Sequence, residues 1–405
     1  MLWKTLEKRI RIGTLTVHFP DGTRRVLGSG EPDVHIRMHR NNTLRRILLY
    51  PPMNLGTSYI DGGWGPEGHD LRPFFSLIMQ NMGVGPRSLA VRKLIALIHR
   101  VAEINWPWRS LRNVSHHYDL DRRLFRKFLD SDLQYSCAYF EQPDATLEQA
   151  QTAKRRHIAN KLHLKPGAKV LDIGCGWGGM ALHLAEHHDA RVTGLTLSRE
   201  QLKIARERAR EAGLEDRVDF RLQDYRLHEE EYDAIVSVGM FEHVGRPQYQ
   251  QFFDQVIKML RPEGTALIHT IGRNGPPTAT NPWIARHIFP GGYIPALSEV
   301  STRIERSRLV LSDLEVLRLH YAKTLEQWNT RFQETRHEFA EELGEQFCRM
   351  WEFYLQISES AFRWSDLVVF QFQLNRRNDV IPLTRDYLYQ RESPVSCREA
   401  GRISA

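Results

Sequence analysis

The amino-acid sequence predicts an α/β protein in which a small α+β domain precedes a doubly wound, Rossmann-like domain. At 405 residues the chain is too long for one small core and suggests two or three units. From about residue 150 onward, short apolar segments alternate with segments of helical periodicity. That alternation is typical of a parallel sheet covered by helices on both faces.

The composition is ordinary for a soluble protein, with 41% hydrophobic and 26% charged residues. No segment approaches the roughly 20 apolar residues of a membrane crossing, and the first residues carry too many charges for a secretory signal. We therefore expect a cytoplasmic protein. The four cysteines are widely spaced and form no C-x-x-C pair, which argues against a disulfide framework and a zinc site, so no metal is expected; they are Cys137, Cys175, Cys348 and Cys397.

Positive charge is concentrated near the N-terminus. The whole chain has a formal net charge of +7, yet residues 1–110 alone contain 16 Lys and Arg against 8 Asp and Glu. A basic face of this kind suits an anionic partner, either nucleic acid or the anionic surface of a membrane. A solvated basic surface without a partner is the other interpretation.

The small domain is predicted over residues 1–105. The segments TLTVHF and VHIRM alternate apolar and polar residues around the turn sequence PDGT, as strands do. The segments NTLRRILLYP and LAVRKLIALIHRVAEI each carry the apolar stripe of a helix. Residues 106–120 are predicted to be a linker, because proline and mixed polarity interrupt any periodicity, and residues 121–405 form the second domain.

In the second domain, strands and helices are predicted to alternate, beginning with a buried strand. Five segments are assigned to strands, namely KVLDIG, ARVTGLTL, VDFRLQD, YDAIVSVGM and TALIHTIG. Two are assigned to helices, namely GMALHLAEHH and REQLKIARERAREAG. Residues 321–374 form a third region, with 12 of the chain's 40 aromatic residues. They are interpreted either as helix core or as the apolar wall of a pocket for a lipid-like substrate.

The turn after the first of these strands, VLDIGCGWGG at residues 170–179, indicates the ligand. A glycine-rich loop at this place lets the backbone approach a ligand closely. The turn lacks the Gly-Lys-Ser/Thr ending of a triphosphate loop, and the next strand lacks the acid of a dinucleotide site. Asp172 instead precedes the glycines, where it can meet an ammonium group. These features favour S-adenosylmethionine, whose amino acid end is zwitterionic.

Further motifs extend over almost the full length of the chain. They are LGTSYIDGGW, HYDL, LQYSCAYF, VLDIGCGWGG, GLTLSREQ, LQDYR, VSVGMFEHVG, IHTIG, FPGGYIPAL, HYAKTLEQW and AFRWSDLVVFQ. In these motifs the chain resembles the cyclopropane-fatty-acyl-phospholipid synthases, which are relatives of the mycolic acid cyclopropane synthases. The resemblance implies a class I methyltransferase fold with helical, aromatic-rich additions that bind the substrate.

The resemblance also implies a set of residues that bind S-adenosylmethionine. Together with Asp172 they are Tyr135, Ser136, Gly174, Cys175, Gly176, Trp177, Gly178, Thr196, Leu197, Ser198, Gln201, Gln223 and Asp224. An Asp or Gln side chain after the third strand can exchange hydrogen bonds with the adenine edge. The alternative for Asp224 is a turn residue at the end of a strand.

The implied reaction adds a methylene across the cis double bond of an acyl chain that is esterified in a phospholipid. An alkene is a poor nucleophile, so the sulfonium methyl must be held in line with it. Transfer leaves a carbocation, and a base removes a proton as the ring closes. By the resemblance this base is a bicarbonate ion, held in a cage of Cys137, Glu242, His269, Ile271 and Tyr321.

The residue types agree with this cage only in part. Glu242 and His269 each follow an apolar strand, so both are expected in the crevice at the strand ends. A buried glutamate beside an anion needs hydrogen bonds or a proton. Cys137 also fits a small buried hydrophobic residue, and Tyr321 also fits core packing. His243 is better explained as a packed neighbour of Glu242 than as a catalyst.

Two departures from the family pattern are visible. The family motif HYDLGND reads HYDLDRR here, so Asp121 and Arg122 replace a glycine and an asparagine. The family often has a cysteine where this chain has Ser358, so a thiol at that position is not required for catalysis here.

Other functions compete with this interpretation. The same fold can produce a methylene-branched or methyl-branched chain, and sequence does not separate these products. A nucleic-acid methyltransferase is disfavoured, because GMFEHVG stands where such enzymes carry a D/N-P-P-Y/F turn. A non-catalytic lipid-binding protein is disfavoured by the cage residues.

The N-terminal domain is expected to bind the anionic inner face of a membrane peripherally and reversibly. We expect no nucleic acid partner. The resemblance to the family also implies a homodimer.

Overall fold

The computed structural model describes residues 2–68, 70–82 and 122–389. The predicted linker over residues 106–120 and the predicted helix in LAVRKLIALIHRVAEI lie outside the described residues, as does Cys397. In the described part of the chain, no helix combines the length and the apolarity that a membrane crossing demands.

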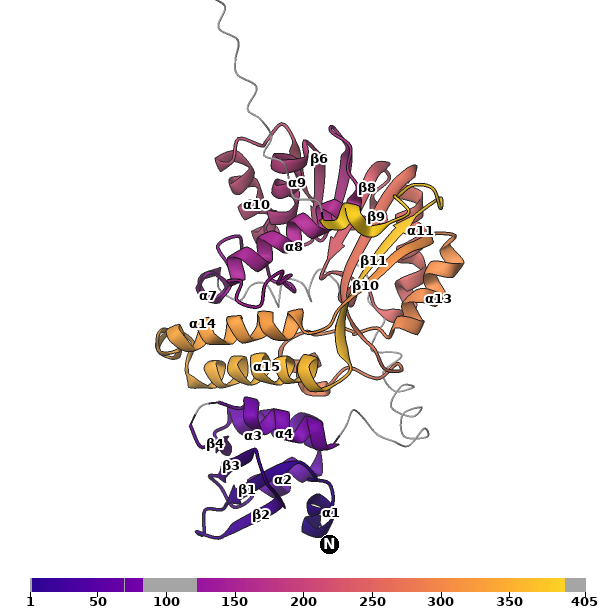
Figure 1. Ribbon diagram of the computed structural model, residues 1–405. Helices are drawn as coiled ribbons and strands as arrows, with labels where there is room; N and C mark the ends of the chain where they lie inside the picture. The colour runs from indigo at the N-terminus through magenta and orange to yellow at the C-terminus, as the bar shows by residue number, and fades with distance from the viewer. Residues whose placement is uncertain (1, 69, 83–121, 390–405) are drawn as a thin grey trace, which may run out of the picture.

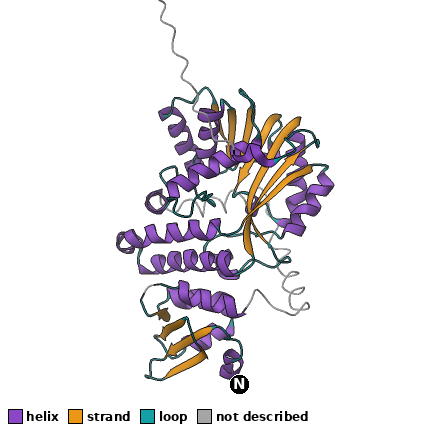
Figure 2. Ribbon diagram, in the orientation of Figure 1, coloured by secondary structure: helices purple, strands orange, loops and turns teal. Residues whose placement is uncertain are grey.

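The N-terminal domain combines a four-stranded sheet with short helices (Figures 1 and 2). Its sheet has the order β2-β1-β3-β4, in which β1 pairs antiparallel with β2 and parallel with β3. The elements are α1 (Leu2–Glu7), β1 (Gly13–His18), β2 (Arg24–Ser29), β3 (Asp33–Met38), α2 (Thr43–Leu49), α3 (Pro51–Ile60), β4 (Trp64–Pro66) and α4 (Arg72–Met82). The two strands and the helix predicted before residue 51 are present, and β2 was missed because its residues are mostly exposed and do not alternate.

The second domain contains a seven-stranded sheet with the order β10-β11-β9-β8-β5-β6-β7. The strands are β5 (Lys169–Ile173), β6 (Arg191–Thr196), β7 (Val218–Leu222), β8 (Tyr232–Val238), β9 (Leu260–Arg273), β10 (Val310–Leu317) and β11 (Leu367–Asn375). The five strands from β9 to β7 are parallel, as predicted. β11 pairs antiparallel with β9 and with β10, so the complete sheet is mixed.

Helices cover both faces of this sheet, which confirms the doubly wound fold. On one face, Val170 and Val192 pack with α8, α9 and α10. On the other face, Leu171 and Ile235 pack with α11 and α13. Alternate side chains of one strand thus enter two different cores. The helices are α7 (Arg122–Phe128), α8 (Leu147–Leu162), α9 (Gly179–His188), α10 (Arg199–Glu211), α11 (Tyr249–Met259), α12 (Pro282–His287) and α13 (Leu297–Ser307).

Two long helices, α14 (His320–Leu343) and α15 (Glu345–Trp364), lie between the N-terminal domain and the large sheet (Figure 1). Helices α3 and α4 pack against α15. The Tyr59 hydroxyl donates to the buried Glu352 carboxylate, and Gln356 Oε1 accepts a 2.6 Å hydrogen bond from the Leu71 backbone N–H. One hydrophobic cluster includes residues of both domains. The domains therefore share a core.

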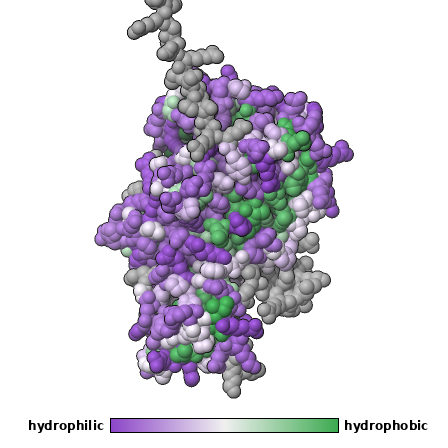
Figure 3. All heavy atoms as spheres, in the orientation of Figure 1, coloured by the Kyte–Doolittle hydropathy of each residue, from purple (hydrophilic) through white to green (hydrophobic). Residues whose placement is uncertain are grey.

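The aromatic residues of the region 321–374 are mostly buried in the described structure. Trp328, Phe332, Trp351 and Phe370 are at most 1% exposed. The region is divided between α14, α15 and β11. Core packing therefore explains most of the aromatic enrichment, and an acyl-chain pocket in this region stays a prediction. On the face shown in Figure 3, apolar residues gather over β10 and β11 and, in smaller groups, on the N-terminal domain.

Candidate active site

A pocket opens at the carboxyl ends of β5, β6, β7 and β8. Twelve of the fourteen residues predicted for the cofactor site line it, namely Tyr135, Ser136, Asp172, Gly174, Cys175, Gly176, Trp177, Thr196, Leu197, Gln201, Gln223 and Asp224. The other two, Gly178 and Ser198, cap the helices that leave the pocket. Gly178 is the N-cap of α9 at φ 86°, and Ser198 caps α10 by accepting a 3.2 Å hydrogen bond from the Gln201 N–H.

The glycine turn forms the floor of the pocket. The backbone N–H groups of Gly174 and Cys175 both donate to the Leu195 carbonyl at 2.9 Å, which holds the turn against β6. Gly176 has φ +55°, and a Cβ added there would meet no atom within 4 Å. The backbone at Gly176 therefore faces open space, which a ligand can occupy.

Asp172 brings an unusual carboxylate to this floor. Its side chain is 2% exposed, and among the described residues its Oδ2 has no hydrogen-bond partner. Burial raises the pKa of Asp172 to about 7. An orphaned buried carboxylate is costly unless a cation or a donor meets it. The ammonium group of an amino acid fits this position.

The wall formed by β6 and β7 is held by polar side chains. Thr196 Oγ1 donates to Gln201 Oε1 at 2.9 Å, and Gln223 Oε1 lies 3.2 Å from His228 Nδ1. Asp224 accepts from the Arg226 backbone N–H at 3.0 Å and from its guanidinium Nε at 2.9 Å. Asp224 therefore caps the 3₁₀ turn η1 (Tyr225–Leu227), as the alternative interpretation expects, while it also lines the pocket.

The third wall comes from the segment before α8, and a lysine of α8 that the sequence analysis missed supports it. Tyr135 stacks on Trp328 with ring centroids 5.1 Å apart. The fully buried Lys154 donates to Gln134 Oε1 at 2.6 Å and to Ser136 Oγ at 2.8 Å. Burial lowers the pKa of Lys154 to about 8. Lys154 therefore places a positive charge directly behind the pocket wall.

Three of the five predicted cage residues lie together at the ends of β8 and β9. Glu242 is 8% exposed, and its Oε1 accepts a 2.6 Å hydrogen bond from the Ile271 backbone N–H. Its Oε2 has no partner among the described residues, and burial raises the pKa of Glu242 to about 7. His269 lies two residues before Ile271 in β9.

The His269 ring is neutral in this environment. Burial lowers the pKa of His269 to about 3. Its Nδ1 lies 3.1 Å from the Gln371 amide nitrogen. With the amide in this orientation Nδ1 accepts, so the single proton of the ring is on Nε2.

Cys137 and Tyr321 lie in two segments that a hydrogen bond joins. The Ala138 N–H donates to Thr324 Oγ1 at 3.0 Å, which ties the Cys137 segment to α14 one turn after Tyr321. Burial raises the pKa of the Cys137 thiol, so the thiol is protonated and a poor nucleophile. The Lys154 ammonium is close enough to influence the pKa of both Cys137 and His269.

The five cage residues are not part of the pocket lining themselves. Ser136 and His243 line the pocket, and Cys137 and Glu242 are their chain neighbours. Cys137 and Glu242 therefore lie next to residues of the pocket wall. His243 is half-buried, and burial lowers its pKa to about 4, so a packed neutral ring agrees with the interpretation from sequence.

Sequence reasoning missed further residues of the wall. Asp132, Gln134, Met240 and Arg226 line the pocket. Asp132 binds the guanidinium groups of Arg155 and Arg208, which fixes the loop before Tyr135 to α8 and α10. No local pattern identifies these residues, although a lysine within the alanine-rich segment QAQTAK at the start of α8 could have drawn attention to Lys154.

Comparisons with known proteins agree with this geometry. The model of the mycolic acid cyclopropane synthetase family matches residues 107–372. A cyclopropane-fatty-acyl-phospholipid synthase of Escherichia coli is 38% identical over 349 residues, which cover 86% of this chain and 89% of that protein. A tuberculostearic acid methyltransferase of Mycobacterium tuberculosis is 35% identical and covers 89% of this chain and 88% of its own length.

A solved structure shares the fold. A mycolic acid cyclopropane synthase complexed with SAH and CTAB superposes with a TM-score of 0.61 at 33% identity, covering 65% of this chain and 97% of that one. The family match spans more than half of the chain and includes the glycine turn, Lys154 and the cage residues. This chain belongs to the mycolic acid cyclopropane synthetase family.

Proposed function

We propose that this protein adds a methylene, derived from the methyl group of S-adenosylmethionine, to the cis double bond of an unsaturated acyl chain in a phospholipid. The alkene carbon forms a bond to the methyl carbon as the sulfur–methyl bond breaks, which releases S-adenosylhomocysteine. The resulting carbocation loses a proton from the new methyl group, and the electron pair of that C–H bond closes the three-membered ring.

The observation that carries this proposal is the pairing of Asp172 with Gly176 at one end of the pocket. The buried Asp172 carboxylate lacks a partner for Oδ2, and the backbone at Gly176, which lines the same pocket, faces open space. A cationic, amino-acid-like ligand satisfies the carboxylate and fills that space. When bound, S-adenosylmethionine supplies the electrophilic methyl group. Tyr135 and Ser136 on one wall and Gln223 and Asp224 on the other then hold its remaining parts.

For the proton removal, we infer that bicarbonate fits the group of residues behind the pocket. Glu242 with a pKa near 7 and His269 with its proton on Nε2 can each donate a hydrogen bond to an anion. Lys154 supplies a compensating positive charge nearby. Cys137, Ile271 and Tyr321 complete the cage. A bicarbonate ion there would supply the base that removes the proton from the carbocation.

The phospholipid substrate requires access to a membrane surface, which we assign to the N-terminal domain. Helix α2 ends in three exposed apolar residues, Leu48, Leu49 and Tyr50, of which Leu49 is 75% exposed. Arg45 lies in the same helix and is also exposed. Apolar side chains beside arginines are suited to reversible binding at an anionic lipid surface. The expected place is the cytoplasmic face of the membrane.

The charge on this domain supports the same assignment to a lesser degree. In its described residues, 2–82, we count eleven Lys and Arg against seven Asp and Glu, so half of the excess in residues 1–110 belongs to residues outside the described part. A homodimer is a further expectation, which the molar mass in solution would test.

A second outcome has a specific observation in its favour. A tuberculostearic acid methyltransferase matches as much of this chain as the Escherichia coli cyclopropane synthase does, at 35% identity. Loss of a proton from a neighbouring chain carbon of the same carbocation leaves a methyl branch and a double bond, whereas a hydride shift followed by loss of a methyl proton leaves a methylene branch. The position of the base, rather than the cofactor site, decides between the two products.

Incubation with S-adenosylmethionine and vesicles of unsaturated phospholipid, followed by proton NMR of the acyl chains, tests the proposal. Upfield ring protons are expected. Vinylidene protons would instead establish a methylene branch, and a new methyl doublet would establish a methyl branch. No S-adenosylmethionine-dependent change in any unsaturated chain would contradict the proposed activity.

A further inference from the structure

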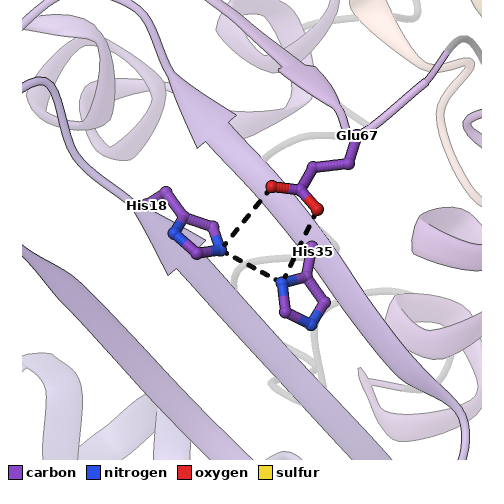
Figure 4. Close-up of side chains that lie close together, drawn as sticks. All are labelled: His18, His35 and Glu67. Carbon is purple, nitrogen blue, oxygen red and sulfur yellow. Dashed lines mark hydrogen bonds and ion pairs between the residues drawn. The ribbon is translucent and has the colours of Figure 1, made fainter. Parts of the chain in front are cut away.

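Three side chains of types that bind metals lie together in the N-terminal domain, far from the candidate active site in the sequence (Figure 4). His18 ends β1, His35 lies in β3 and Glu67 follows β4. His18 Nε2 is 3.0 Å from His35 Nδ1. The two carboxylate oxygens of Glu67 each lie 3.9 Å from one of these nitrogens.

The sheet itself sets this arrangement. β1 and β3 are parallel with Thr16 opposite His35, so His18 is the diagonal neighbour of His35. β3 and β4 are antiparallel with Ile36 opposite Pro66, which places Glu67 beside His35. The flanking Val34 and Ile36 are buried, so His35 projects from the opposite, solvent-facing side of the sheet. Three neighbouring strands thus present one donor each on one face.

The distances suit a single small cation. Zinc binds imidazole nitrogen and carboxylate oxygen at about 2.0 to 2.2 Å, so two ligands of a tetrahedral ion are roughly 3.4 Å apart. The observed separations of 3.0, 3.9 and 3.9 Å bracket this value. Two imidazoles disfavour magnesium and calcium, which prefer oxygen ligands. The donor set leaves a fourth position for water.

An outer carboxylate supplies a second observation. Asp33 Oδ2 lies 3.3 Å from His35 Nε2, on the side of the ring away from the cluster. A proton held on Nε2 by Asp33 leaves the lone pair of Nδ1 directed at His18 and Glu67. Histidines that bind metals commonly have such a carboxylate partner, which fixes the tautomer and the ring orientation.

One group competes with a cation at this place. Arg37 Nη2 lies 3.2 Å from Glu67 Oε1. Both side chains are about half exposed, at 57% and 49%, and pairs of this kind contribute roughly 0 to 1 kcal/mol. Displacement of the guanidinium from one oxygen therefore costs little compared with the binding of zinc by three ligands.

We propose that His18, His35 and Glu67 bind a Zn²⁺ ion that ties β1, β3 and β4 together. Strand β4 has only three residues and pairs with β3 alone, so a metal that bridges the three strands would stabilise that edge of the sheet. The cysteine spacing had led us to expect no metal. The proposed site uses histidines that are 17 residues apart in sequence and meet only in the sheet.

The test uses the full chain after removal of metals with a chelator. Zn²⁺ is titrated in competition with a chromophoric chelator, and the thermal midpoint is measured with and without zinc. The unaltered protein is expected to bind zinc at a site that is lost in His35→Ala and weakened at least tenfold in Glu67→Gln. Zinc should raise the thermal midpoint of the unaltered protein and not that of His35→Ala. Asp33→Asn should weaken binding about tenfold, because it removes the orienting carboxylate.

Two control variants separate this site from other histidines. His39→Ala removes an exposed histidine just after β3, and His187→Ala removes one member of the histidine group on α9, whose ring lies 4.7 Å from that of His183. Neither control is expected to lose the tight site. The proposal is overturned if His35→Ala and Glu67→Gln bind zinc as the unaltered protein does, or if His187→Ala alone abolishes binding.

Discussion

Asp172 lies in an environment unlike that of an ordinary surface carboxylate. Its pKa is raised by burial from 3.8 to about 7. Between about pH 4 and pH 7 the folded chain therefore holds a proton that the unfolded chain has lost. Stability then falls as the pH rises through this range. We predict that Asp172→Asn removes this fall, so that the variant is the more stable protein at pH 8.

The same variant should bind S-adenosylmethionine at least tenfold more weakly, because it lacks the charge that meets the ammonium group. Denaturant unfolding at several pH values and calorimetric titration measure the two effects. Asp313→Asn, which alters a buried carboxylate in β10, serves as the control and should keep cofactor affinity. Unchanged affinity in Asp172→Asn would remove Asp172 from the cofactor site.

Gly176 is a second residue with a defined requirement. A valine there would occupy open space in the pocket and would adopt φ +55°, which β-branched residues rarely do. We predict that Gly176→Val loses measurable S-adenosylmethionine binding while circular dichroism shows a retained fold. Gly213→Val, at another positive φ with open space around it, is the matched control for backbone strain. If both variants keep cofactor affinity, the turn does not hold the ligand.

A variant of Glu242 can separate the removal of the proton from the binding of the cofactor. We predict that Glu242→Gln keeps S-adenosylmethionine affinity within a few fold and lowers turnover by at least about 10², which is typical of a positioned proton acceptor. Strict removal of dissolved carbonate should lower turnover of the unaltered enzyme, and added bicarbonate should restore it. Glu359→Gln, at a buried glutamate of α15 paired with Arg363, is the control. Full turnover by Glu242→Gln would direct the search for a base to His269 and Tyr321.

At the level of secondary-structure elements, helix α2 ends in apolar side chains that are exposed to solvent instead of packed in the core. Leu49 is 75% exposed next to Leu48 and Tyr50. Burial of one leucine in lipid is worth about 1.5 to 3 kcal/mol, which corresponds to tenfold or more in affinity. We predict that Leu49→Asp weakens binding to anionic vesicles at least tenfold without lowering the thermal midpoint.

Sedimentation with vesicles of phosphatidylglycerol at two salt concentrations measures this binding, which should weaken as salt screens the charges. Leu383→Asp, at a fully exposed leucine of the second domain, is the control and should bind as the unaltered protein does. If Leu49→Asp binds normally, the membrane surface of this protein lies elsewhere.

In the whole molecule, the shared core predicts that the two domains unfold together. Phe353 of α15 is 2% exposed and contacts the rings of Tyr59, Phe75 and Trp283 at 5.8, 5.2 and 4.6 Å between centroids. We predict that Phe353→Ala costs about 3 to 5 kcal/mol and still shows one unfolding transition. Loss of hydrogen-exchange protection in β1 and β5 should then coincide. A separate early transition of the N-terminal domain would contradict a shared core.

The sequence by itself determined the five parallel strands from β5 to β9 and the helices α9 and α10, because each carries a clear local pattern, whereas α11, between β8 and β9, was not predicted. It also located the glycine turn and Asp172, since a glycine-rich loop after a buried strand has few alternatives. β10 and β11 were not identified, because their positions in the sheet depend on pairing with β9 rather than on their own pattern.

Only the tertiary structure decided which distant residues act together. Lys154 is near both Cys137 and His269 because α8 packs on the sheet, and no local pattern predicts a buried lysine. His18, His35 and Glu67 meet because three strands pair in one register. Such contacts form between residues that are far apart in the chain. The periodicity of apolar residues reflects only the local secondary structure, so it does not predict these contacts.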